Sequence, residues 1–317
     1  MTTKNLVAVQ ACLMLFLLAA CSAVKPAPSV TEAAPSAQAQ PATGMQYHFV
    51  TDQLLLPTTQ AQTQAFALNV DGDTGQRGDN VIGGLLTLLT SAAPGLEMQA
   101  TLDQAVSTGK LVSLHLVTSD DPLNDTSVSW SIVLGQETQS APSFDGSDEF
   151  PVDPAAPVNA PIVGSLTAGH FAGGPGAARL RISLFGEPVD VDLIGLRLEA
   201  DVSAKGCANG KLGGGVTVGE FRGKLLPTIA AGLTQVVKGD PAGANILLQA
   251  FDSDGDGAIS VQELEKNPIL MMAISPDLDL LDASSAFNPG QDGEKDSYSV
   301  GLGFTCVPSV FTAPGDG

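Results

Sequence analysis

Four carboxylate side chains fall within the twelve residues 252–263. A hard divalent cation such as calcium takes six to eight oxygen ligands, and side chains at alternate positions of a loop can supply them. Gly257 stands where such a loop turns sharply, a conformation that glycine adopts at little cost. Because four carboxylates this close together repel one another, a bound cation would stabilise the segment. The ligands expected are Asp252, Asp254, Asp256, the backbone carbonyl of Ala258, Ser260 and Glu263.

Helices are expected on both sides of this loop. Apolar residues recur at helical spacing before it, and Leu264 begins the apolar face of a second helix that starts near Val261. Asn267 and Pro268 predict the start of another helix, which runs to about Ile274 and leaves the exit helix short. The apolar residues before the loop are Ala244, Leu247, Leu248 and Phe251.

Residues 243–267 closely resemble the EF-hand superfamily, in which an acidic loop binds calcium between two helices. The resemblance implies a calcium site at 252–263, where Glu263 binds with both oxygens and Ile259 anchors the loop to a neighbouring element. The short exit helix departs from the family pattern. A solvated acidic turn without an ion is the alternative.

A second acidic segment, residues 69–80, repeats part of this pattern. Asn69, Asp71 and Asp73 occupy its first, third and fifth positions, and Asp79 lies near its end. Threonine stands at the sixth position instead of glycine, so the segment resembles a degenerate EF-hand-like or dockerin-type loop. Two interpretations remain open. The four side chains form a second calcium site, or Asp79 or the asparagine after it caps a helix that begins near residue 81.

The amino-terminal residues have the features of an export signal. Lys4 provides a positive charge, and the apolar stretch 11–20 is too short to span a bilayer. Residues 18–21, LAAC, resemble the lipobox of bacterial lipoproteins. The resemblance implies cleavage before Cys21, acylation of that residue and anchoring in a membrane. With Ser22 next, it implies sorting to the outer membrane, on its periplasmic face or at the cell surface. A secreted protein cleaved at an Ala-x-Ala site is the alternative.

Composition and periodicity divide the chain into segments. Residues 22–45 are mostly Ala, Pro, Ser, Thr and Gln, which is typical of a disordered tether. Helical spacing returns at about 218–237, where Pro227 predicts a kink or break. The expected segments are a signal peptide (1–20), a lipidated cysteine and tether (21–45), a β-rich body that begins with an acidic loop and helices (46–217), a helical segment with the calcium loop (218–275), and an acidic loop with a closing strand (276–317).

Alternating apolar and polar residues predict antiparallel strands in the β-rich body. With 35 glycines and 21 prolines, the chain is rich in turns. We expect an α+β fold: an antiparallel β-sandwich-like body, a short helical part at its start and a single helix–loop–helix near the carboxyl end. Residues 136–161 are expected to form a long surface loop. The strands expected are 46–56, 111–117, 128–134, 178–185, 196–202 and 299–307.

Charge and cysteine content exclude several functions. A formal net charge of −20 argues against binding of nucleic acid or anionic lipid through a basic patch. Apart from Cys12 and Cys21, only Cys207 and Cys306 remain, and neither belongs to a CxxC motif or a Cys/His cluster. No thiol redox site or structural zinc is therefore expected. In an oxidising compartment the two cysteines are expected to form a disulfide, with two buried free thiols as the alternative.

The sequence gives little support for catalysis. It contains no G-x-S-x-G, no phosphate-binding glycine loop and no HExxH motif. His115 alternates with apolar neighbours and is expected to be packed in a strand. We expect no enzymatic activity, with a hydrolase based on two carboxylates as one alternative. A calcium-dependent carbohydrate-binding or surface-adhesion module is the other, although Trp130, Tyr47 and Tyr298 are expected to pack in or beside strands.

The whole chain also resembles uncharacterised bacterial surface lipoproteins. They share an acidic loop near the start, the segment GCANGKLGG (206–214) and a closing strand VGLGF (300–304). This resemblance implies an architecture and no activity. The function expected is calcium binding by a membrane-anchored bacterial lipoprotein, in which calcium stabilises an extracytoplasmic β-rich domain. A single well-formed loop favours a structural ion over a sensor.

Overall fold

The computed structural model describes residues 44–72, 78–93, 95–239 and 241–312, all of which belong to the unit 40–317. The expected signal peptide, Cys21 and nearly all of the tether lie outside the described residues. Asp73 of the segment 69–80 lies outside them as well.

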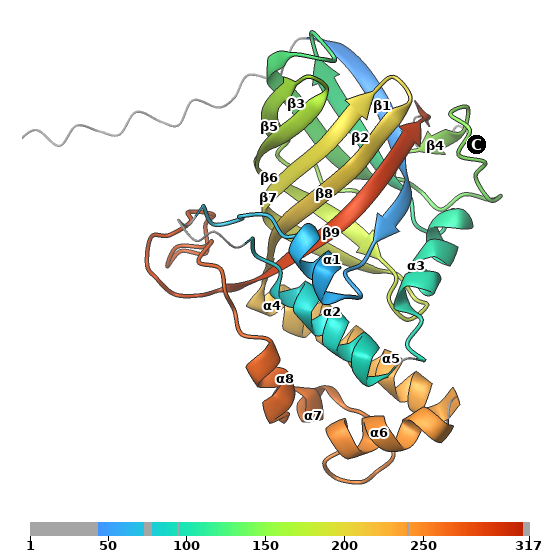
Figure 1. The fold of residues 1–317 in the computed structure, drawn as a ribbon, viewed down its shortest axis with the longest axis vertical. Helices are drawn as coiled ribbons and strands as arrows, with labels where there is room; N and C mark the ends of the chain where they lie inside the picture. The colour runs from blue at the N-terminus through green and yellow to red at the C-terminus, as the bar shows by residue number, and fades with distance from the viewer. Residues whose placement is uncertain (1–43, 73–77, 94, 240, 313–317) are drawn as a thin grey trace, which may run out of the picture. The chain divides into compact units, whose positions relative to one another are not determined.

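Eight antiparallel strands close into a barrel (Figure 1). Seven pairings each join one strand to the next barrel strand along the chain. The eighth pairs the last strand with the first and closes the barrel. Val50 in the first strand is opposite Leu114 on one side and Val307 on the other. The strands, in order, are β1 (Met45–Leu55), β2 (Ser113–Ser119), β3 (Asp125–Leu134), β5 (Ile162–Thr167), β6 (His170–Ile182), β7 (Val189–Ser203), β8 (Gly206–Thr217) and β9 (Ser297–Pro308).

The mixed helix and strand content agrees with the expected fold, but the strands form a closed barrel and not a sandwich. Alternation correctly predicts which face is buried: in β3, Val128, Trp130 and Ile132 are buried and the residues between them are partly exposed. The same alternation suits two packed sheets or one closed sheet. Closure depends on the pairing of β1 with β9, which lie at opposite ends of the described chain.

The alternating pattern does not predict β5 or the glycine-rich β8. The glycines of β8 leave room for large neighbouring side chains. A methyl group on Gly210 would lie 2.6 Å from the Phe304 ring, and one on Gly215 would overlap Leu280 Cδ1. Glycine weakens a strand through backbone entropy, so it is expected where close approach requires it.

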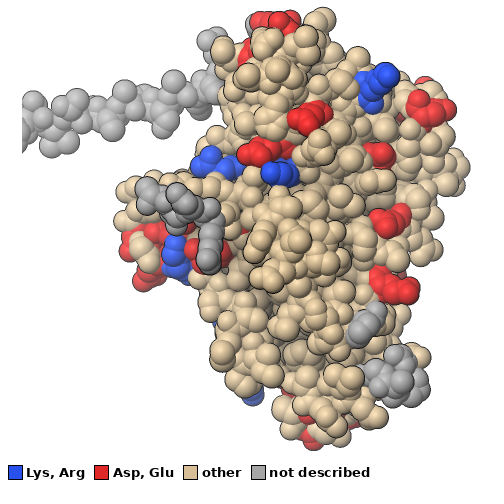
Figure 2. Space-filling view, viewed as in Figure 1, with Lys and Arg blue, Asp and Glu red and all other residues tan. Residues whose placement is uncertain are grey.

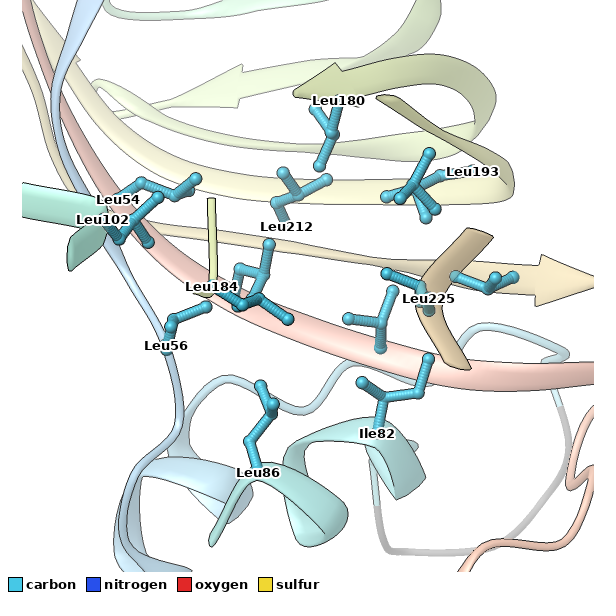
Figure 3. Packing of buried hydrophobic residues seen from close by; sticks show 14 of the residues in the cluster. Leu54, Leu56, Ile82, Leu86, Leu102, Leu180, Leu184, Leu193, Leu212 and Leu225 are labelled. Atoms are coloured by element: carbon cyan, nitrogen blue, oxygen red, sulfur yellow. The ribbon is translucent and has the colours of Figure 1, made fainter. Parts of the chain in front are cut away.

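Helices cover one end of the barrel (Figure 1), and we call this group of helices the helical cap. In Figure 3, Ile82 and Leu86 of α2 (Val81–Ala92) point toward leucines from barrel strands, such as Leu180 and Leu212. These side chains belong to one buried apolar cluster. Full burial of each stabilises the fold by roughly 1.5–3 kcal/mol, so the helical cap and the barrel share a core.

The remaining helices include a run that follows β8. No break occurs at Pro227, which is the second residue of α5; a π-helical turn at residues 221–225 lies immediately before this helix, and the backbone stays helical across both. Proline has no N–H group to donate to the backbone hydrogen bonds of a helix, and a π turn is one way in which the regular series of these bonds is interrupted. The helices besides α2 are α1 (Gln60–Ala65), α3 (Met98–Ser107), α4 (Val218–Glu220), the π-helix η1 (Phe221–Leu225), α5 (Leu226–Gly239), α6 (Pro241–Phe251), α7 (Val261–Lys266) and α8 (Pro268–Ala273).

Cys207 of β8 and Cys306 of β9 form a disulfide, which confirms the expected pairing. The two residues are opposite each other on adjacent strands and 99 positions apart in sequence. The covalent loop therefore contains all of the helices α4 to α8. Within the expected surface loop 136–161, the short strand β4 (Glu149–Pro151) pairs with β10 (Val310–Thr312) beside the barrel.

Candidate metal centre

The C-terminal acidic loop, residues 252–263, joins α6 to α7. Asp252, Asp254 and Asp256 each place a carboxylate oxygen within 4.8 Å of those of the other two. Among the residues that the structure describes, no Lys, Arg or His forms an ion pair with any of the three. Three like charges are thus held together without a described basic partner.

Backbone amides of the loop fix these carboxylates. The two oxygens of Asp252 accept hydrogen bonds from the N–H groups of Gly255 (2.7 Å) and Gly257 (3.0 Å). Asp254 and Asp256 each accept a bond from the amide two residues later. Gly255 and Gly257 have φ values of 77° and 82°, a region that favours glycine. The sequence therefore folds the segment into a loop that holds its carboxylates close together.

Glu263 is not part of this group of three. Its Oε1 accepts from the N–H of Ser253 (2.6 Å), and its Oε2 accepts from the N–H and hydroxyl of Ser260, both at 2.9 Å. Ser260 in turn caps α7 through the amide of Glu263, which completes a capping box. The Ser260 N–H, more than any other group, holds the pKa of Glu263 at about 2, so this carboxyl is ionised at neutral pH.

The flanking helices anchor the loop to the core. The structure confirms the expected entering helix, α6, and the short exit helix, α7. Ile259 and Leu264 are buried in the same apolar cluster as the barrel leucines. Asn267, after α7, donates from Nδ2 to the carbonyl of Ala250 near the end of α6 (2.6 Å). The helices on the two sides of the loop are thereby linked.

The N-terminal acidic loop, residues 69–80, has different partners. Asp71 forms an ion pair with Lys295 (Oδ2 to Nζ, 3.6 Å), and Asp79 Oδ2 accepts from the N–H of Val70 (2.8 Å). Asn69 Oδ1 accepts from the N–H of Gly72 (2.7 Å). Asp73, the fourth ligand expected here, is outside the described residues. Within the described ranges, no group of three carboxylates is gathered at this loop.

Asn80, and not Asp79, caps α2. Its Oδ1 accepts from the N–H of Gly83 (3.0 Å) and from that of Gly301 in β9 (2.8 Å). Its Nδ2 donates to the carbonyls of Gly301 and Thr63, both at 3.1 Å. Asn80 is buried, so a single amide joins the loop, α2 and the barrel.

The acidic run 277–296 packs against the N-terminal acidic loop. Val70 forms a small apolar cluster with Leu278 and Leu280. Asp279 is 5 % exposed; its Oδ2 accepts from the N–H of Gly293 (2.7 Å), and its Oδ1 has no hydrogen-bond partner among the described residues. Sequence periodicity did not indicate this contact between the two segments.

His115 lies inside the barrel as a packed residue. Trp130 can only donate, and its Nε1–H bonds to His115 Nδ1 (3.0 Å). The neutral ring therefore carries its proton on Nε2 and donates it to Thr51 Oγ1 (2.7 Å). Complete burial lowers the pKa of His115 to about 3. Its burial agrees with the prediction of a packed residue, and the structure adds that the ring is bonded at both nitrogens.

Two of the three aromatic residues considered for sugar binding are buried, and one enclosed cavity is apolar. Trp130 and Tyr298 are buried, as expected for packed residues. A cavity of about 40 Å³ between the barrel and its helical cap is lined, among the described residues, by apolar side chains alone. Figure 2 shows acidic side chains spread over one face of the protein with few basic ones among them.

Comparison of the chain with models of known protein families, with curated proteins and with solved structures finds no match. In the part of the chain that the structure describes, no helix combines the length and hydropathy that crossing a bilayer requires. The chemistry of the candidate centre must be inferred from its own side chains.

Proposed function

We propose that this protein is a calcium-binding, membrane-anchored lipoprotein in which the ion stabilises the barrel and its helical cap. The observation that carries the proposal is the group formed by Asp252, Asp254 and Asp256, for which the described residues provide no basic partner. A ligand set made only of oxygens favours a hard cation, and an irregular loop suits calcium better than magnesium, which demands regular octahedral geometry.

The proposed ligands are the three aspartates, the Ala258 carbonyl, Ser260 directly or through water, and Glu263. Glu263 is ionised and its Oε1 contacts Ser253, next to Asp252, which supports its role. To bind the ion, its Oε1 must leave the amide of Ser253. This exchange replaces the hydrogen bonds that Oε1 accepts from the N–H and hydroxyl of Ser253 and the N–H of Asp254 with a contact between opposite charges.

The proposed benefit to stability follows from the apolar contacts of the loop. Ile259, Leu264 and Phe251 belong to the cluster that fills the barrel and its cap. An ion that binds only the folded loop therefore stabilises the whole unit, by about 2.7 kcal/mol at a hundredfold excess over Kd. Even a weak site, with Kd of about 10⁻⁴ M, fills where calcium is abundant, as it is outside cells.

The membrane anchor is proposed from the lipobox-like residues 18–21. Incorporation of labelled palmitate in a bacterial host is expected for the full chain and is expected to be lost in Cys21→Ser. Incorporation that persists in Cys21→Ser would show that the anchor assignment is wrong, without bearing on the calcium site.

Isothermal titration and thermal unfolding with calcium, magnesium or chelator test the calcium proposal. We expect calcium to bind once at this loop and to raise Tm, with a much smaller effect of magnesium. The double variant Asp252→Ala/Glu263→Ala is expected to lose both effects. If this variant retains calcium uptake and the calcium-dependent Tm shift, the proposal is wrong. Micromolar binding with an unchanged Tm would instead favour regulation over stabilisation.

A further inference from the structure

The centre of the C-terminal acidic loop is joined to α5 by one hydroxyl group. The N–H of Ile259 donates to Thr234 Oγ1 (2.9 Å), and the same hydroxyl donates to the carbonyl of Ile259 (3.1 Å). A threonine hydroxyl can do both because it has one donor and two acceptor sites. Ile259 is buried, so its two backbone groups need partners within the protein.

Thr234 is itself held in a fixed position. Its neighbour Leu233 is fully buried, and Ile229 lies about one turn earlier on the same buried face of α5. Both side chains belong to the core shared with the barrel. The hydroxyl therefore holds the loop against a rigid part of the fold.

The position of Ile259 is central to the proposed ligand set. It lies between Ala258 and Ser260, two of the proposed oxygen donors. Fixing the amide and carbonyl of Ile259 also fixes the peptide units that carry those donors. A loop that is ordered before the ion arrives binds more tightly, because less conformational freedom is lost on binding.

We infer that Thr234 is the positioning residue of the calcium loop. Through this hydroxyl, α5 holds the loop in its ligand-binding conformation and connects ion occupancy to the helical cap of the barrel. The inference rests on the proposed calcium function. It also assigns the site a structural role, since a loop tied to the core does not open to expose a groove.

Three variants of the full chain test this inference. Thr234→Val keeps the shape of the side chain and removes the hydroxyl, whereas Thr234→Ser keeps the hydroxyl. Thr228→Val is the matched control, because Thr228 is on the same helix, is also partly buried and donates only to its own helix at Lys224 O. We expect Thr234→Val to weaken calcium binding about tenfold, and Thr234→Ser and Thr228→Val to bind like the wild type.

Hydrogen exchange of the Ile259 amide gives a readout that needs no calcium. In chelator, this amide is expected to be protected in the wild type and in Thr234→Ser, and to exchange at least tenfold faster in Thr234→Val. If Thr234→Val does not fold, Thr234→Ala removes the same hydroxyl without adding a methyl group to the loop contact.

The outcomes separate the two proposals. Wild-type protein that binds no calcium contradicts the proposed function, and the exchange measurement in chelator then still decides whether Thr234 holds the loop. Wild-type protein that binds calcium, with unchanged affinity and unchanged Ile259 protection in Thr234→Val, contradicts only the role of Thr234. Equal losses in Thr234→Val and Thr228→Val would show a general effect on α5 and also overturn the inference.

Discussion

The N-terminal and C-terminal acidic loops both precede a helix and both place aspartates at alternate positions, yet their charges have different partners. Asp71 of the N-terminal loop pairs with Lys295, and Val70 beside it is buried against Leu278 and Leu280. The three aspartates of the C-terminal loop have no ion pair among the described residues and bond only to amides of their own loop.

Similar acidic patterns can therefore differ in whether they need a bound cation. Both loops have an apolar anchor, but only the N-terminal loop also has a lysine from another part of the chain, which neutralises part of its charge. A loop whose carboxylates are bonded only to amides of the same loop, with no basic partner among the described residues, retains mutual repulsion, which a divalent cation relieves. We therefore expect the stability of the C-terminal loop, and not that of the N-terminal loop, to depend on calcium.

The largest effect is expected from Asn80→Ala. It removes the cap of α2 and leaves both backbone groups of Gly301 without their partner, at a cost of about 3–4 kcal/mol in unfolding free energy. Denaturant unfolding should show the same loss with calcium and with chelator. Asn124→Ala, which removes one exposed bond to the amide of Ala168, is the control and should lose less than about 1 kcal/mol. A calcium-dependent loss in Asn80→Ala would place an ion at the N-terminal loop.

Acid is expected to weaken the barrel independently of either loop, through His115. Its pKa falls from 6.5 to about 3 on folding, so the unfolded chain binds the proton first. This contribution to stability is complete above pH 6.5 and falls by about 1.4 kcal/mol per pH unit below it, or about 2 kcal/mol by pH 5. Unfolding curves across this range, compared with those of His115→Gln, should show a shallower pH dependence in the variant. Equal slopes would contradict a buried neutral ring.

A direct comparison of the loops uses matched carboxylate-to-amide changes. Asp256→Asn removes one ligand charge and should weaken calcium binding about tenfold, or about 1.4 kcal/mol. Asp71→Asn should leave calcium affinity unchanged. Isothermal titration of both variants with calcium shows which loop binds the ion. A weaker calcium affinity in Asp71→Asn would mean that both loops bind it.

The smallest effect is expected from Lys295→Gln. The ion pair with Asp71 is partly exposed, with 47 % of the lysine side chain accessible, so its loss should cost less than about 1 kcal/mol and less still in high salt. The informative measurement is the calcium dependence of Tm. If Lys295 takes the place of an ion, the variant should gain a calcium response that the wild-type N-terminal loop lacks. An unchanged response would show that Lys295 does not have this role.

Sequence periodicity was informative for local structure. The spacing of Leu247 and Phe251 predicted α6, Asn267 and Pro268 predicted the start of α8, and alternation predicted the buried face of β3. Each of these depends on neighbours within a few residues. The disulfide was also predictable, because only Cys207 and Cys306 remain in the body of the chain.

Contacts between distant segments were not predictable in this way. Alternation cannot distinguish a barrel from a sandwich, since closure depends on the pairing of β1 with β9. β8 was missed because its glycines carry no apolar signal, and they are explained only by the bulk of Phe304 and Leu280 opposite them. Thr234 has no distinguishing pattern in an amphipathic helix. Its importance becomes visible only when Ile259 is placed beside it.

The pairing of β9 with β1 has a consequence for biosynthesis. A ribosome produces residues 45–55 long before residues 297–308, which form the seam of the barrel. Until that last segment emerges, β1 and β8 both have an open edge that can pair with another nascent chain. Products that lack residues 297–308 are therefore expected to aggregate more readily than the chain that contains them.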